Sequence, residues 1–107
     1  MPDELVTQSA SELRRRIARR ELSPVELVEA TLARIAQVNP RLNAVVTLNE
    51  RAMDEARALE ERMSRGEPGG ALCGLPVGIK DVTPVAGVRT TYGWSRVPGM
   101  NRWTRRR

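Results

Sequence analysis

The sequence of 107 residues has no histidine, no phenylalanine and a single cysteine, Cys73. Without histidine, a Ser-His-Asp triad, a Cys-His pair and a histidine-ligated metal site are excluded. One cysteine excludes an internal disulfide and a Cys-x-x-Cys zinc site. No apolar run reaches the roughly 18 residues of a transmembrane helix, and the polar N-terminus lacks the order of a signal peptide. We therefore expect a cytoplasmic protein, one small domain or a piece of a larger one, with no metal, organic cofactor or membrane partner.

The net charge of +5 suggests a polyanion as partner, but its distribution does not. All acidic residues precede residue 95, and the body before that point is neutral. The surplus lies in residues 95–107, on Arg96, Arg102, Arg105, Arg106 and Arg107. A small basic nucleic-acid-binding protein, with Trp103 for base stacking, stays open as an alternative. Because no recognition motif accompanies the tail, we expect no nucleic-acid partner.

Lysine is nearly absent as well, since Lys80 is the only lysine among the 18 basic residues. A surface charge does not need lysine in a chain that uses arginine everywhere else. A titratable amine does need it, because the guanidinium of arginine stays protonated. Composition alone leaves two interpretations of Lys80 open, a leftover surface residue and a functional amine.

Capping patterns predict the first two helices. Ser9 and Glu12 are spaced as a capping box, and so are Ser23 and Glu26. Apolar residues recur on one face after each box, which is typical of amphipathic helices. The arginines of the first helix are expected on its solvated face, with a phosphate-binding patch as the alternative. The two helices are expected over residues 10–20 and 24–37.

Asn39 and Pro40 are predicted to end the second helix, because the residue before proline avoids helical angles. The β-branched residues of 42–48 then predict a strand. Asn49 is a candidate cap for a third helix over about residues 50–65.

A second strand is predicted where the lysine lies, over residues 75–81. Alternation places Val77 and Ile79 on one face of this strand. Gly78 and Lys80 share the other face, and a strand glycine often marks the close approach of a backbone or ligand. The spacing is a weak indication of a site, since many strands end in Gly-x-Lys.

Residues 74–93, GLPVGIKDVTPVAGVRTTYG, resemble the lysine-bearing stretch of the amidase signature family. Members carry a similar Gly-[Leu/Ile/Val]-Pro-[Val/Ile]-[Gly/Ala]-[Ile/Val]-Lys-Asp run, followed by Ala-Gly and Thr-Thr. Residues 9–48 are similar to the family's opening, with two helices, an Asn-Pro stop and a strand. The resemblance implies an α/β fold, a large mixed sheet covered by helices. Residues 1–94 would form the N-terminal part of that domain, helices plus two strands, which is incomplete.

The resemblance also implies a function, the hydrolysis of carbon–nitrogen amide bonds of a small-molecule substrate. The family uses a serine nucleophile, a second serine held with a cis peptide bond, and a lysine base, which Lys80 matches. A serine hydroxyl is a weak nucleophile until a base takes its proton. The pKa of a free lysine is about 10.4, too high for a base at neutral pH, and burial disfavours the charged form. We therefore expect Lys80 to be buried, which Gly78 beside it and the flanking Val77 and Ile79 would suit.

The sequence departs from the family pattern after Gly93. The family's serines lie in a glycine- and serine-rich stretch downstream of the lysine, whereas Ser95 is the only serine after Lys80 here. Acidic residues vanish, both tryptophans appear and arginine dominates. We expect a truncated amidase whose reading frame is broken near residue 94, with 95–107 as an aberrant basic tail. Such a chain is expected to be inactive alone and partly unfolded or aggregation-prone, because its strands lack neighbours.

Two alternatives stay open within the resemblance. One is the amidase-like component of a tRNA-dependent glutamyl/aspartyl amidotransferase, its A subunit, which releases ammonia from glutamine. It shares the lysine motif, although the DVTPVAG run of residues 81–87 looks more like general amidases. The other is a non-catalytic interaction fragment of a heteromeric amidase. The sequence leaves the amide substrate and the oligomeric state open.

Overall fold

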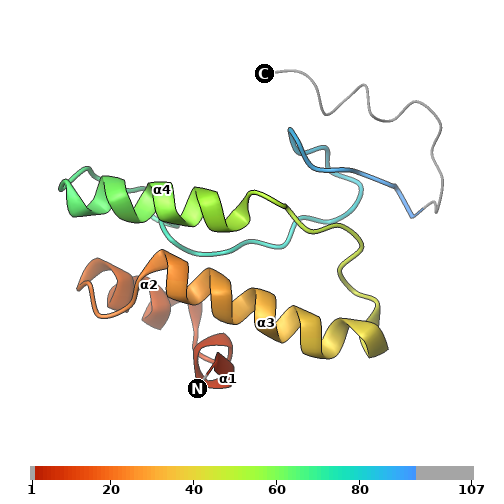
Figure 1. The fold of residues 1–107 in the computed structure, drawn as a ribbon, viewed down its shortest axis with the longest axis horizontal. Helices are drawn as coiled ribbons and strands as arrows, with labels where there is room; N and C mark the ends of the chain where they lie inside the picture. The colour runs from red at the N-terminus through yellow and green to blue at the C-terminus, as the bar shows by residue number, and fades with distance from the viewer. Residues whose placement is uncertain (1, 94–107) are drawn as a thin grey trace. The chain divides into compact units, whose positions relative to one another are not determined.

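The computed structural model describes residues 2–93, and this part is mainly helical (Figure 1). Its helices in chain order are α1 (Pro2–Val6), α2 (Ala10–Ala18), α3 (Pro24–Leu42) and α4 (Ala52–Ser64). The chain divides into two compact units. The helical unit contains the residues up to Leu42 and Glu50–Pro76. The lysine unit contains Asn43–Asn49 and the residues from Val77 on.

Local capping starts α2 and α3 where the sequence predicts. The Ser9 hydroxyl accepts a hydrogen bond from the Glu12 backbone N–H at 3.2 Å. At α3 the box is reciprocal, because the Glu26 N–H donates to Ser23 Oγ and the Ser23 N–H donates to Glu26 Oε2, each at 3.0 Å. These bonds satisfy N–H groups that a helix start leaves without an intrahelical partner. Both predicted starts are confirmed.

The predicted stop of α3 at Asn39 and Pro40 is wrong, since the helix continues through the proline to Leu42. Proline lacks one helical hydrogen bond and crowds the preceding turn, which disrupts a helix interior. Pro40 lies only two residues before the end of the helix, where few bonds depend on it. Asn43 follows with a positive φ of 49°, a conformation that asparagine tolerates better than most residues and that commonly ends a helix.

The strand predicted over 42–48 does not form among the described residues. Leu42 belongs to α3, and residues 43–49 are irregular. Within residues 2–93 the only β pairing is an isolated antiparallel bridge between Val85 and Val88. A strand requires a hydrogen-bonded neighbour, and no described segment supplies one. No helix in the described part has the length and apolar character of a membrane span.

The third predicted helix is confirmed as α4, but its predicted cap is wrong. Arg51 occupies the N-cap position in place of Asn49, and its side chain makes no capping hydrogen bond. Within the helical unit α3 packs against both α1 and α4, and α4 runs back along α3 (Figure 1). This arrangement brings the C-terminal end of α4 near the start of α3.

The core of the helical unit is a small apolar cluster. Ile17 of α2 and Leu27 of α3 are fully buried, and Leu13 and Leu22 complete the cluster. The chain after α4 turns over this cluster at Gly74, which has a positive φ of 84°. A Cβ at Gly74 would lie 3.0 Å from the Cδ1 atom of Ile17. Glycine is therefore required both by the backbone conformation and by the close approach.

Ile17→Ala should lower the free energy of unfolding of the helical unit by about 2–5 kcal/mol, because it leaves a cavity in the only buried cluster of the described residues. Loss of the far-UV circular dichroism signal on heating measures this. Leu72→Ala is the matched control, since Leu72 is 67% exposed. Equal losses of stability in the two variants would contradict this assignment of the core.

Candidate lysine site

The segment that carries Lys80 is irregular and exposed rather than a buried strand. Residues 75–80 have no regular secondary structure, so the strand predicted over 75–81 is wrong for the described chain. Val77 is 64% exposed and Ile79 53% exposed, and Lys80 is exposed as well. The predicted burial of the lysine is therefore wrong, because nothing in the described lysine unit covers this segment. A Cβ at Gly78 would meet open space, so no close approach requires glycine there.

A tight turn holds the backbone directly after Lys80. The carbonyl oxygen of Lys80 accepts hydrogen bonds from the N–H groups of Val82 and Thr83, at 2.7 and 2.9 Å. The peptide group that joins the lysine to Asp81 is therefore fixed by two donors. The Lys80 side chain itself has no hydrogen bond or ion pair with any residue of the described part.

Asp81 and Thr91 form a clasp that closes the loop behind this turn. The Thr91 N–H donates to Asp81 Oδ1 at 2.7 Å, and the Thr91 hydroxyl donates to Asp81 Oδ2. The Tyr92 N–H donates to the Asp81 carbonyl oxygen at 2.9 Å. Thr91 is buried, with 7% of its surface exposed. We call this pair the Asp81–Thr91 clasp.

The clasp favours the ionised form of the Asp81 carboxylate. The hydrogen bond from the Thr91 hydroxyl lowers the pKa of Asp81, and the Thr91 N–H lowers it further. Partial desolvation opposes this shift, while the Gly93 N–H and the charge of Arg89 add smaller effects in the same direction as Thr91. Both Thr91 bonds are therefore charge-assisted at neutral pH, which makes them stronger than bonds between neutral groups.

Thr91 is the functional candidate that the sequence pattern did not single out. The Thr-Thr pair at residues 90 and 91 is part of the motif, but neither spacing nor periodicity shows that Asp81 and Thr91 meet across a ten-residue loop. An aspartate next to the lysine and a threonine near the end of the same run are the only signal available.

The described lysine unit contains no serine, so it offers threonine hydroxyls but not the family's nucleophile. Ser95 and the predicted tail over 95–107 lie outside the described residues, and the predictions that rest on them stay predictions. Among residues 2–93, no three Cys, Asp or Glu side chains are grouped in a way that would hold a metal ion.

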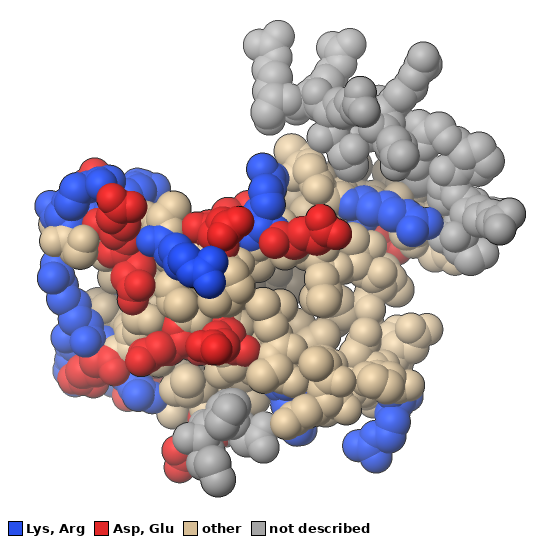
Figure 2. Space-filling model, viewed as in Figure 1, with Lys and Arg blue, Asp and Glu red and all other residues tan. Residues whose placement is uncertain are grey.

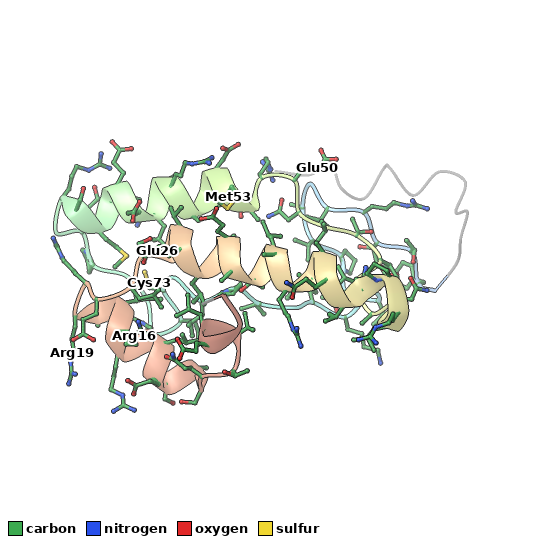
Figure 3. All side chains as sticks on the ribbon, turned by 60° about the horizontal axis from the view of Figure 1, so that its bottom comes forward. Arg16, Arg19, Glu26, Glu50, Met53 and Cys73 are labelled. Carbon is green, nitrogen blue, oxygen red and sulfur yellow. The ribbon has the colours of Figure 1, made fainter. Side chains whose placement is uncertain are left out.

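The arginines of α2 and of the turn that follows it make structural contacts within the helical unit rather than an anion site. Arg14 donates to the carbonyl oxygens of Ala71 and Gly70, and Arg20 donates to that of Met63. Arg16 bonds to Gln8, while Arg19 extends outward from the end of the helix (Figure 3). These bonds favour the predicted solvated face with structural contacts over a phosphate patch.

Acidic and basic side chains alternate over the helical unit (Figure 2). Exposed ion pairs explain this alternation, and two are Arg15 with Glu12 at 2.8 Å and Arg65 with Glu61 at 3.0 Å. Pairs of this kind each contribute little to stability. On the face that Figure 2 shows, acidic and basic groups are thus interspersed over the helical unit.

Comparison with known proteins decides the family. The family model described as Amidase matches residues 26–99, which include the run with Lys80 and the Asp81–Thr91 clasp. The chain belongs to the amidase family. The resemblance seen in residues 74–93 is thereby confirmed.

Three relatives of this amidase-family chain are each named as the A subunit of glutamyl-tRNA(Gln) amidotransferase. The protein from Carboxydothermus hydrogenoformans is 44% identical over 89 residues, which are 82% of this chain and 18% of that protein. That from Salinispora tropica is 44% identical over 91 residues, 84% of this chain and 18% of its own length. That from Thermus thermophilus is 43% identical over 84 residues, which are 78% of this chain and 16% of that protein. The chain thus spans less than a fifth of these relatives. No solved structure matches it.

Acidification should open the Asp81–Thr91 clasp only below the ordinary pKa of an aspartate, 3.8. The pKa of Asp81 is lowered in the folded chain, so the clasp stabilises the fold fully above the unfolded pKa. That stabilisation is lost as the pH falls through the lower, folded pKa. The Thr91 amide proton shift in an NMR titration measures the midpoint. Asp81→Asn should abolish the titration, and a wild-type midpoint at or above 3.8 would contradict the clasp.

Proposed function

We propose that this chain supplies the lysine base of an amidase-type site that hydrolyses carbon–nitrogen amide bonds. The observation that carries the proposal is the only lysine of the chain, which lies in the GLPVGIKD run within the region that the amidase family matches. A chain that uses arginine for every other basic side chain has an amine at this one position. An amine can accept a proton where a guanidinium cannot.

The proposed chemistry is acyl transfer to a serine. The Lys80 amine takes up, through a second serine, the proton of the nucleophilic hydroxyl as the bond from serine oxygen to carbonyl carbon forms. The carbon–nitrogen bond then breaks, and the departing nitrogen receives that proton. Water hydrolyses the resulting ester and restores the serine. The tetrahedral intermediates require hydrogen-bond donors for the oxyanion.

The exposed position of Lys80 limits what this chain does alone. The lysine lacks the burial that would suit a base, and the described lysine unit contains no serine. We propose that the active site is an α/β domain in which further polypeptide covers Val77 and Ile79 and brings the serines. Residues 75–81 and 43–48 would then gain strand partners and join its mixed sheet. The 107-residue chain alone is proposed to be inactive.

A chimera tests the role of Lys80. Residues 9–93 of this chain replace the matching segment of the relative from Carboxydothermus hydrogenoformans, which is 44% identical to the chain. We expect the chimera to release ammonia from an amide, and Lys80→Met to lower that rate at least about 10⁴-fold, the scale for loss of a member of a catalytic triad. Lys80→Arg should be equally inactive, because it keeps the charge but cannot give up its proton.

Arg89→Met is the matched control, because it removes another cation of the lysine unit. It should leave the rate of the chimera within about threefold, as expected for a substitution away from the reacting groups. The 107-residue chain alone provides the baseline and should release no ammonia. Retained activity in Lys80→Met would refute the assignment of the base, and measurable turnover by the chain alone would refute its inactivity.

A second candidate function is the ammonia-releasing component of a tRNA-dependent amidotransferase, with glutamine as the amide. The observation that favours it is the name shared by the relatives from Carboxydothermus hydrogenoformans, Salinispora tropica and Thermus thermophilus. The DVTPVAG run favours a general amidase instead. A gene for a partner component of the amidotransferase beside the gene of this chain would support the second candidate, and a lone gene would support the first.

A further inference from the structure

The Asp81–Thr91 clasp begins one residue after the lysine that the proposed function uses. With the turn before it, the chain is restrained at three points, which are the Lys80 carbonyl, the Asp81 carbonyl and the Asp81 carboxylate. The donors to the last two come from Thr91 and Tyr92, about ten residues further along the chain. The backbone from which the Lys80 side chain extends is therefore restrained, through Asp81, by Thr91 and Tyr92 at the other end of the loop.

The clasp also determines what the Asp81 carboxylate contacts. Thr91 supplies a donor to each carboxylate oxygen, its N–H to Oδ1 and its hydroxyl to Oδ2. No ion pair joins Asp81 to Lys80 among the described residues, although the two are neighbours in the sequence. A carboxylate without these donors would attract the ammonium next to it and favour its charged form. A lysine that is to act as a base requires the opposite.

We propose that Thr91 is a positioning residue for Lys80, because it holds both carboxylate oxygens of Asp81, fixes the backbone at the lysine and withholds the carboxylate from the lysine ammonium. This proposal rests on the proposed function of Lys80 as a base. It assigns a role to the buried threonine at the end of the motif, which acts on the lysine through its bonds to Asp81. The threonine hydroxyl carries the role, since valine would fill the same space without donating.

Because Lys80 is the only lysine of the chain, the proposal can be tested by the reactivity of its amine, without a measurement of catalysis. Trace acylation of the 107-residue chain with acetic anhydride, read by mass spectrometry across pH, gives the rate for the Lys80 amine. The α-amine of the chain is the internal reference. We expect Thr91→Val to slow Lys80 acylation about threefold at neutral pH, the scale of an exposed ion pair, because Oδ2, without the hydroxyl, attracts the ammonium while the Thr91 N–H still donates to Oδ1. Thr91→Ser keeps the hydroxyl and should match the wild type.

Asp81→Asn separates positioning from a general loss of structure. Like Thr91→Val it weakens the clasp, because the Thr91 donors lose their charged acceptor, but it leaves no carboxylate to attract the lysine, so acylation should not slow. The Asp81→Asn/Thr91→Val double variant should behave like Asp81→Asn. Thr83→Val is the matched control, because the Thr83 side chain is exposed in the same loop and its backbone N–H is kept.

An unchanged rate in Thr91→Val would overturn the proposal. Equal slowing in Thr91→Val and Asp81→Asn would overturn it too, since the clasp would then only maintain the fold. The outcome is independent of the chimera experiment. Acylation reports the state of the Lys80 amine, whereas the chimera reports whether that amine takes part in hydrolysis.

Discussion

The structure of the helical unit depends on the burial of Ile17 against Leu27. These two side chains join α2 to α3, and the turn at Gly74 brings the following chain directly over Ile17. Arg14 adds hydrogen bonds to the carbonyl oxygens of the same returning loop. A cluster this small provides limited stabilisation, so the unit needs the loop over its core as much as the helices around it.

The parts of the fold that the sequence predicts are those decided by near neighbours. The capping boxes at Ser9 and Ser23 involve residues three positions apart, and both form. The helix lengths follow from the apolar spacing, apart from the last turn of α3, where Pro40 comes too late in the helix to end it. Local rules were sufficient for these two caps because the partners lie within one turn.

The predicted strands failed for the opposite reason. β-branched residues in 43–48 and alternation in 75–81 indicate segments suited to pairing, but a strand forms only beside another strand. At the candidate site too, the residues of the motif are predictable from the sequence, whereas a contact between distant residues is not. The motif identifies Lys80 and Asp81, whereas the contact of Asp81 with Thr91 depends on how a ten-residue loop closes. No periodic pattern encodes that closure, and the family match that names the chemistry carries no information on it either.

The length of α3 has a consequence for the order in which the chain acquires structure. Isolated helices shorter than about 12–15 residues are marginal in water, because nucleation is costly. With 19 residues and a reciprocal cap, α3 exceeds that limit, whereas α2 has 9 residues and depends on packing. During synthesis α2 leaves the ribosome first, yet it has nothing stable to pack on until α3 has followed. We therefore expect α2 to become stable only after α3 has formed, so that the N-terminal end of the chain folds against α3.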